Sequence, residues 1–378
     1  MYTTKRLSSN ENFSAVPESR GRVTGPLVEA LPPYLPDRHL MNPQASALDK
    51  FLDQHPIESK GDILILRAVP GEYLRRFSGR SIVCQQTYKP DADALARFGV
   101  NVVTDPDAPC DLCIVFATKH KEETLYHMAR AASLLEEGGS LVVSAANDLG
   151  APSLEKRCAE LLGGVQSFSK HKCRVFRGRK ASGRLNEELM ASWLRAGQLQ
   201  PISGTDLVSR PGVFSWNRID PGSRLLAEYL PEDLGGHGAD LGAGYGYLSH
   251  TLLSRSHAVT ELHLFEAEQK ALEAARRNLA AFASGVRLHF HWHDVTAGLP
   301  IDRLDFVIMN PPFHTGRDAE PGLGQAFIRV ALASLKSGGR LYFVANRHLP
   351  YEKVIRTFAG REKTLAERDG YKVMEVRK

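Results

Sequence analysis

The sequence predicts an α/β protein built from two tandem copies of one fold, each a mostly parallel sheet flanked by helices. From residue 61 onward, short apolar runs alternate with amphipathic helical patterns, which is typical of βα units. Two segments also recur in both halves. "ASLLEEGGSLVVSAANDLG" at 132–150 resembles "ASLKSGGRLYFVANRHLP" at 333–350, and "SKHKCRVFRGRK" at 169–180 resembles "ERDGYKVMEVRK" at 367–378. A long-period repeat of this kind indicates a duplicated fold.

The repeat divides the chain into parts. Its 378 residues suffice for two domains that each bury a core. We expect a poorly ordered arm over 1–45, a first domain over 46–180, a linker over 181–205 and a second domain over 206–378. Chance resemblance is the alternative, because a helix, Gly-Gly and a strand follow one another in many α/β proteins.

The elements of the two halves follow the same order. In the first half, "GDILIL", "RSIVCQQ", "VNVVTD" and "DLCIVFA" predict strands, and "KEETLYHMARAASLLEEGG" predicts a helix before the strand "SLVVSAA". In the second half, "GADL", "ELHLF", "VRLHF" and "LDFVI" predict the corresponding strands. The basic "SKHKCRVFRGRK" and its counterpart predict the final strand of each half.

The composition is that of a soluble globular protein, with 43% hydrophobic and 24% charged residues. No run approaches the roughly 18 apolar residues of a membrane span, and the N-terminus has no apolar signal region. We therefore expect a cytoplasmic protein with no membrane partner. A net charge of +5 is compatible with a nucleic-acid partner but does not require one.

The five cysteines predict neither a disulfide framework nor a metal site. Cys110 and Cys113 have CxxC spacing, but no second pair with zinc-site spacing follows them. The sequence around them, "CDLCIVF", alternates like a buried strand. We expect no metal.

The second half has a glycine-rich turn that the first half lacks. "GADLGAGYGYLSHTLL" at 238–253 places Gly242, Gly244 and Gly246 between a strand and a helix, where a ligand can approach the backbone. The matching segment of the first half, "GDILILRAVPGEYLRRF", has no such cluster. By itself "GAGYG" also fits simple tight packing.

Three acidic residues follow three successive strands of the second half. Asp240 ends the strand before the glycine turn, and a carboxylate there needs a hydrogen-bond donor. Glu266 ends the next strand, where a ribose diol can be bound, and Asp294 ends the third, near where an adenine amino group would lie. Each acid alone is more often a helix cap or a solvated residue. Together with the glycine turn they favour a nucleoside-containing cofactor.

These features resemble the motifs of class I S-adenosylmethionine-dependent methyltransferases. "DLGAGYG", Glu266, Asp294 and "NPPF" at 310–313 carry the resemblance, and the NPPF variant is similar to enzymes that methylate an exocyclic or amide nitrogen. The resemblance implies two tandem Rossmann-like class I methyltransferase domains with seven-stranded sheets, of which the N-terminal copy is degenerate. It implies S-adenosyl-L-methionine as cofactor.

A narrower resemblance covers most of the chain. "RPGVFSWNRIDPGSRLLAEYLP" at 210–231, "NPPFHTG" and "VANRHLPYEKVIRTF" are similar to the bacterial ribosomal RNA guanine-N2 methyltransferases RsmC and RlmG. "PGVFS" and "FHTG" favour the small-subunit type, whereas "ANRHLPY" is closer to the large-subunit type. The chain departs from both in "LGAGYGYLS", in a longer arm and in Glu rather than Asp at 266. The resemblance implies methylation of a guanine N2 amine in ribosomal RNA, with 16S RNA favoured.

The NPPF string suits an amino group whose lone pair is delocalised into a ring. Two acceptors, the Asn310 side-chain oxygen and the Pro311 carbonyl, would hold the two N–H groups and stabilise the developing positive charge. Phe313 would stack on the base, at about 1–3 kcal/mol. The alternative is a rigid turn that merely ends a strand.

The predicted residues fall into three sets. The catalytic set is Asn310, Pro311 and Phe313. The cofactor set is Asp240, Gly242, Gly244, Gly246, Glu266, Asp294, Val295 and Asn310. The substrate set is Pro312, His314, Phe214, Arg177, Arg179 and Lys180.

The last three residues belong to the densest basic stretch, which either contacts RNA phosphates or guards a sheet edge. Asp220 and Pro221 read as the N-cap and first residue of a helix. We expect a monomer that acts on ribosomal RNA or a ribosomal subunit. The alternatives are a 23S RNA enzyme, an enzyme for protein amides or adenine N6, and an RNA-binding factor with a relic pocket.

Overall fold

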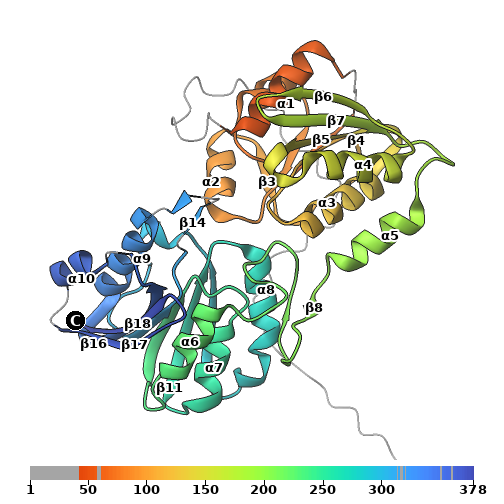
Figure 1. Ribbon diagram of the computed structural model, residues 1–378. Coiled ribbons are helices and arrows are strands. Elements are labelled where there is room, and N and C mark those ends of the chain that lie inside the picture. The colour runs from red at the N-terminus through yellow and green to blue at the C-terminus, as the bar shows by residue number, and fades with distance from the viewer. Residues whose placement is uncertain are drawn as a thin grey trace, which may run out of the picture.

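The computed structural model describes residues 42–57, 61–312, 314–315, 318–319, 321–349, 351–358 and 361–378. They form two α/β halves, one above the other in Figure 1. Most of the expected arm lies outside the described residues. Near the end of that expected arm, Asn42 caps the first helix: its side-chain oxygen accepts hydrogen bonds from two backbone N–H groups.

The first half is a seven-stranded sheet in the order β3-β2-β1-β4-β5-β7-β6. Six strands run parallel to one another and β7 is antiparallel to its neighbours. Its strands are β1 (Ile63–Leu66), β2 (Ile82–Gln85), β3 (Asn101–Val103), β4 (Cys110–Phe116), β5 (Leu135–Ala146), β6 (Gln166–Lys170) and β7 (Cys173–Arg179). Its helices are α1 (Pro43–Gln54), η1 (Glu72–Phe77), α2 (Lys89–Arg97), α3 (Lys121–Leu134), η2 (Asn147–Leu149) and α4 (Ala151–Leu162).

The second half repeats this order as β12-β11-β10-β13-β16-β18-β17, again with one antiparallel strand. Its strands are β10 (Gly236–Leu241), β11 (Val259–Glu266), β12 (Arg287–Trp292), β13 (Leu304–Met309), β16 (Leu335–Asn346), β17 (Arg361–Arg368) and β18 (Tyr371–Arg377). Its helices are α6 (Pro221–Tyr229), α7 (Tyr247–Arg255), α8 (Gln269–Asn278), η3 (Ala280–Phe282), η4 (Val295–Ala297), α9 (Pro321–Ser334) and α10 (Glu352–Phe358). A small hairpin of β14 (His314–Thr315) and β15 (Asp318–Ala319) follows β13. The duplicated fold predicted from the repeat is confirmed.

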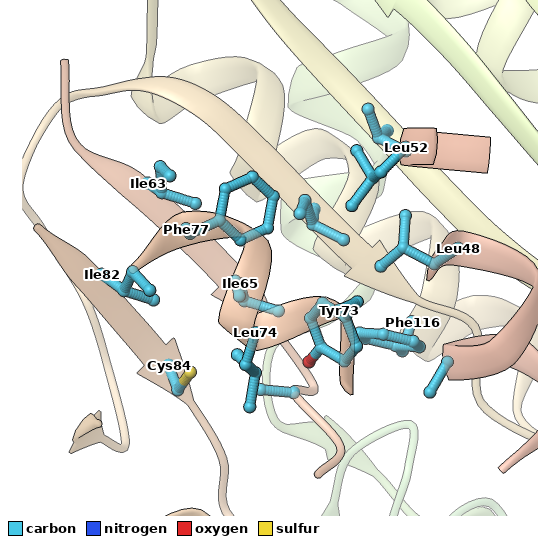
Figure 2. Close-up of a cluster of buried hydrophobic side chains, with 14 of the residues drawn as sticks. Leu48, Leu52, Ile63, Ile65, Tyr73, Leu74, Phe77, Ile82, Cys84 and Phe116 are labelled. Atoms are coloured by element: carbon cyan, nitrogen blue, oxygen red, sulfur yellow. The ribbon is translucent and has the colours of Figure 1, made fainter. Parts of the chain in front are cut away.

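Each sheet is buried on both faces, as the apolar strand sequences require. In the first half, α1, η1 and α2 cover one face and α3 and α4 the other (Figures 1 and 2). In the second half, α6, α7 and α8 cover one face, while η4, α9 and α10 cover the other. Among the described residues, no helix combines the length and apolar character needed to cross a bilayer. The five cysteines are free and buried.

The segment between the halves has structure of its own. It contains α5 (Glu187–Ala196), and a short pair of strands follows, β8 (Gln200–Pro201) with β9 (Val208–Ser209). Trp193 of α5 is buried against the α3 side of the first sheet. Helix α5 therefore packs as part of the first half, inside the stretch that the sequence marked as a linker.

One lysine recurs at the same place in both halves. Lys180 Nζ donates to the carbonyl of Leu135, just past the end of α3, at 2.6 Å, and Lys378 Nζ donates to the carbonyl of Leu335, just past α9, at 2.7 Å. Each lysine satisfies a carbonyl at a helix C-terminus, where positive charge is favoured. This explains part of the sequence repeat.

Candidate active site

The glycine-rich turn follows β10 and opens α7. Gly242, Gly244 and Gly246 all have positive φ angles, of 71°, 55° and 85°, which favour glycine. The N–H groups of Gly242 and Ala243 both donate to the carbonyl of Phe265, at 2.8 and 3.1 Å. These bonds fix the turn against the end of β11.

Glu266 is held at the edge of this turn. Its Oε2 accepts from the N–H of Gly244 at 2.8 Å and its Oε1 accepts from the N–H of Glu268 at 2.8 Å. Burial raises the pKa of Glu266 above its ordinary value, although the backbone bonds oppose that effect. Each carboxylate oxygen has a second lone pair, so the side chain can still accept from a ribose hydroxyl.

Asp240 is a buried carboxyl with one unpaired oxygen. It is fully buried beneath the turn, and its Oδ2 accepts from the hydroxyl of Ser249 at 2.7 Å. Its Oδ1 is buried and has no hydrogen-bond partner. Burial raises the pKa of Asp240 to about 7. An unpaired buried carboxyl oxygen fits a ligand that brings a donor such as an ammonium group.

The raised pKa predicts how stability depends on pH. Between about pH 4 and pH 7 the folded protein holds a proton on Asp240 that the unfolded chain releases, so this group's contribution is lost as pH rises. We expect Asp240→Asn to match the wild type near pH 4 and to exceed its free energy of unfolding by about 4 kcal/mol above pH 7. Urea unfolding of both proteins at several pH values measures this. A constant difference across the range would contradict the assignment.

The third predicted acid, Asp294, caps η4. Its Oδ1 accepts from the N–H and the hydroxyl of Thr296, at 2.9 and 2.7 Å. The next residue, Val295, is buried among the apolar side chains beneath α9. Its side chain belongs to the core, so a direct contact of Val295 with a cofactor would come from its backbone.

Asn310 follows β13 and is held by the start of α6. Its Nδ2 donates to Asp220 Oδ2 at 2.9 Å and to Ser223 Oγ at 2.7 Å. The two protons of the amide are thereby used, which leaves Oδ1 as an acceptor for a bound group. Asp220 also caps α6 through the N–H of Ser223 at 2.8 Å, as the sequence predicts.

The link from Asp220 and Ser223 to Asn310 was not predicted from the sequence. The signal was present in "DPGS", where a cap residue and a hydroxyl residue stand three positions apart.

The remaining residues of the NPPF segment are described in part. Pro311 is buried and Pro312 is exposed. Phe313 lies outside the described residues, and the side chain of His314 is not among them. The predicted stacking role of Phe313 and the predicted substrate contact of His314 stay predictions.

The segment before α6 brings one predicted substrate residue to the surface. Phe214 is 62% exposed, whereas its neighbour Val213 is buried. Further along this segment, the carbonyl of Arg218 accepts from the hydroxyl of Tyr245 in the glycine-rich turn at 3.3 Å. The segment that carries Phe214 is thereby attached to the turn.

The predicted basic residues lie elsewhere. Arg177 donates to Ser140 Oγ at 3.0 and 3.2 Å, and Arg179 donates to the carbonyl of Gly138 at 3.2 Å. With Lys180 they lie at the amino end of β5 in the first sheet, whereas the predicted cofactor residues lie at the carboxyl ends of strands in the second sheet. Strand β7 is also the second strand from the edge, not the edge strand itself. The structure therefore does not bring this stretch together with the other predicted residues.

The matching positions of the first half are filled. The pairing Leu66–Val115 corresponds to Leu241–Met309, so Arg67 stands where the second half has Gly242, and Phe116 stands where it has Asn310. Phe116 is buried against Tyr73, with ring centroids 5.3 Å apart (Figure 2).

At a third matching position, the first half has an amide side chain in place of a carboxylate. By the same register, Gln86 stands where the second half has Glu266. Its Oε1 accepts from the N–H of Tyr88 at 2.9 Å, and its Nε2 donates to the carbonyl of Ala68 at 2.7 Å. At the three positions where the second half has Gly242, Glu266 and Asn310, the first half thus has larger or already bonded side chains.

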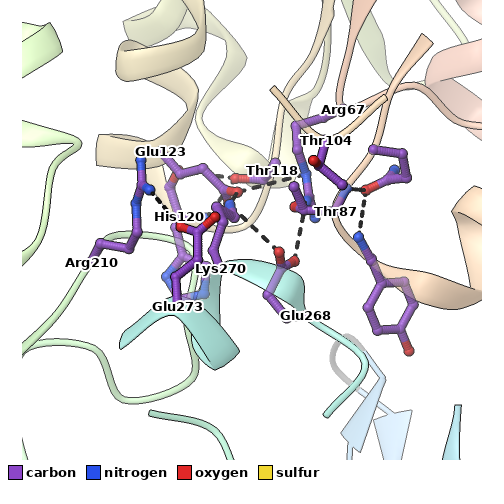
Figure 3. A network of polar contacts seen from close by, with 12 residues as sticks. Arg67, Thr87, Thr104, Thr118, His120, Glu123, Arg210, Glu268, Lys270 and Glu273 are labelled. Carbon is purple, nitrogen blue, oxygen red and sulfur yellow. Dashed lines mark hydrogen bonds and ion pairs between the residues drawn. The ribbon is translucent and has the colours of Figure 1, made fainter. Parts of the chain in front are cut away.

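Arg67, which stands at the position of Gly242, forms a contact between the two halves (Figure 3). Its Nη1 lies 3.1 Å from Glu268 Oε2, at the start of α8, and its Nε lies 3.6 Å from Glu123 Oε1. Lys270 of α8 pairs with the same carboxylate of Glu123, which is 3% exposed. Burial would raise the pKa of Glu123, but Lys270 and Arg67 outweigh it and hold that pKa well below its usual range.

Backbone bonds join the halves beside these ion pairs. The N–H of Lys89 donates to the carbonyl of Ala267, and the N–H of Gln269 donates to the carbonyl of Thr87, both at 2.8 Å. Trp292 Nε1 donates to both of those carbonyls at 2.9 Å. The loop that directly follows Glu266, at the end of β11, is therefore fixed by the first half.

Comparison with known proteins agrees with this division. Residues 204–375 match the family model described as the methyltransferase small domain, and residues 79–195 match the methyltransferase small domain N-terminal model. The ribosomal RNA small subunit methyltransferase C of Salmonella newport (strain SL254) is 31% identical over 277 residues, covering 73% of this chain and 78% of that protein. Its counterpart in Citrobacter koseri is 32% identical over 278 residues, covering 74% and 79%.

A solved structure is similar over nearly the whole chain. It is that of the T. thermophilus 16S rRNA N2 G1207 methyltransferase in complex with AdoMet and guanosine, with a TM-score of 0.74 and 25% identity. The match covers 90% of this chain and 93% of that one.

Proposed function

Because the chain belongs to the family of the ribosomal RNA small subunit methyltransferase C, a family of S-adenosylmethionine-dependent methyltransferases, we propose that it methylates the N2 amine of one guanine in 16S ribosomal RNA. The T. thermophilus relative is named for guanine G1207, and we propose the equivalent guanine as the target. An enzyme of ribosomal RNA works where ribosomes are made, so we propose that it acts in the cytoplasm. We also propose that it is a monomer.

The observation that carries the proposal is the orientation of Asn310. With its two amide protons donated to Asp220 and Ser223, its Oδ1 is a fixed acceptor at the end of β13. A guanine N2 amine presents two N–H groups and a lone pair delocalised into the ring. An acceptor on one N–H favours a pyramidal nitrogen and stabilises the charge that develops there. The carbonyl of Pro311 would accept from the second N–H.

The second half also fits the cofactor. S-adenosylmethionine, when bound, supplies an electrophilic methyl group on a sulfonium. Three glycines of positive φ would let it approach the turn, Glu266 would accept from its ribose hydroxyls, and Asp294 would accept from its adenine amine. The unpaired Oδ1 of Asp240 is suited to its ammonium group.

Phe214 is proposed to stack on RNA beside the target. We expect Phe214→Ala to raise KM for RNA by roughly 5- to 150-fold, the equivalent of a lost stack worth about 1–3 kcal/mol, with unchanged affinity for S-adenosylmethionine. Steady-state kinetics with 16S RNA and calorimetry with the cofactor measure the two effects. Tyr229→Ala, at the far end of α6, is the matched control, since this ring is also exposed. Equal effects of the two variants would contradict the proposed role of Phe214.

The function is tested by mass spectrometry of ribosomal RNA digests from a strain that lacks the gene. We expect one N2-methylguanosine to disappear from 16S RNA and to return when the wild-type gene is restored. Loss from 23S RNA would instead identify a large-subunit enzyme. Unchanged ribosomal RNA would refute the proposal.

A further inference from the structure

A cluster of imidazoles and one carboxylate lies on the second sheet, away from the cofactor residues. Glu261, His263 and His289 each offer one ligand atom, and these atoms lie within 4.8 Å of one another. His263 of β11 and His289 of β12 are direct partners in the parallel ladder, so their side chains emerge on the same face. Their rings are stacked, with centroids 4.4 Å apart.

The carboxylate is placed between the two rings. Glu261 Oε1 lies 3.1 Å from His263 Nε2 and 3.0 Å from His289 Nε2. Its other oxygen accepts from Arg287 at 2.6 Å, which fixes the carboxylate and leaves Oε1 directed at the imidazoles. His237 Nε2, on the neighbouring strand β10, lies 3.6 Å from Glu261 Oε2 and is a candidate for a fourth ligand of a bound ion.

A second observation points to a ligand. His289 Nε2 is buried and makes no hydrogen bond, although Glu261 Oε1 is close. A buried nitrogen lone pair without a donor is costly unless something binds it. In addition, His263 Nδ1 lies 3.0 Å from His291 Nε2, an outer contact of the kind that orients metal-bound histidines.

The set of donor atoms suits a cation. Two imidazole nitrogens and one carboxylate oxygen are ligands that Zn²⁺ takes in proteins.

We propose that Glu261, His263 and His289 bind a divalent transition metal of the Zn²⁺ class, with His237 or water as the fourth ligand. The metal would join β11 to the edge strand β12. These two strands lead to Glu266 and Asp294, so the metal would stabilise the sheet edge behind the cofactor residues. The sequence led us to expect no metal, because the ligands come from two strands and have no zinc-motif spacing.

The proposal is tested on the untagged full-length chain at pH 7.5. We expect Zn²⁺ to bind one per chain in calorimetry, and Co²⁺ to give the visible absorption of a tetrahedral site. The double variant His263→Ala/His289→Ala should weaken binding at least 100-fold. His291→Phe should weaken it about tenfold, through the lost outer contact. His257→Ala is the control: this histidine is exposed in the turn before β11, and its loss should change nothing.

An NMR titration of the wild type tests the proposal even if the double variant does not fold. On Zn²⁺ titration of the wild type, the histidine ring resonances that shift in NMR spectra should be those of His263 and His289. Binding at millimolar or weaker affinity, or equal binding by the wild type and a folded double variant, would overturn the proposal. Shifts at other histidines alone would do the same.

Discussion

Asn310→Ala is expected to lower kcat for methyl transfer by about 10²- to 10³-fold while leaving S-adenosylmethionine bound with near wild-type affinity. The physical reason is that Oδ1 acts on charge that develops at the substrate nitrogen, so its loss affects the transition state more than the ground state. Single-turnover kinetics with 16S RNA and calorimetry with the cofactor separate the two quantities. Activity within a few fold of wild type would refute the assigned role of Asn310.

Two further variants show whether the orientation of the Asn310 amide matters for activity. Ser223→Ala removes one acceptor of the Asn310 amide and leaves Asp220 in place, so the amide is held less firmly and kcat should fall by a smaller factor. Asn310→Asp keeps an oxygen at the site but places a carboxylate near Asp220. This variant should lose activity as well, because the two carboxylates repel each other. If Asn310→Asp were fully active, the amide would not be needed.

Lys270→Met is expected to lower the free energy of unfolding by about 3–5 kcal/mol, because it leaves the buried carboxylate of Glu123 with a reduced set of partners. Glu123 and Lys270 are 147 residues apart and belong to different halves. The loss should also weaken cofactor binding, since α8 begins three residues after Glu266. Denaturant unfolding and calorimetry measure these effects.

A double-mutant cycle tests the pair itself. Glu123→Gln combined with Lys270→Met should be less destabilising than the sum of the two single variants. Arg157 and Glu160 on α4, an exposed ion pair of the same charge type, form the control, and their cycle should give less than about 1 kcal/mol. An additive result for Glu123 and Lys270 would mean that this contact does not couple the halves.

The fold was predictable because its signals are local. Apolar runs, amphipathic helices and the Gly-Gly repeat can each be recognised in a short stretch of sequence. The duplication follows from comparing the two stretches 132–150 and 333–350. Asp220 stands directly before a proline and was predicted as a helix cap, which the structure confirms. The cap at Asn42 was not predicted, because this residue was counted in the arm. The helix within 181–205 was not assigned, because its apolar residues were read as part of a connection.

The position of the site could be predicted from the sequence, but its long-range contacts could not. Strand ends meet at one edge of a parallel sheet, so residues after successive strands could be grouped from the sequence alone. The partners of Asn310 could not be found this way, since Asp220 is 90 residues away. The same applies to Arg67, which in the sequence is simply a residue after a strand. Its ion pair with Glu268 spans 201 residues and depends on how the halves pack.

The central claim is that the second half transfers a methyl group to a guanine N2 amine while the first half does not react. It is tested most directly by incubating the purified chain with 16S RNA and isotope-labelled S-adenosylmethionine, followed by nucleoside analysis. We expect label in N2-methylguanosine with the wild type and none above background with Asn310→Ala. Label in another nucleoside, or equal label with both proteins, would contradict the claim.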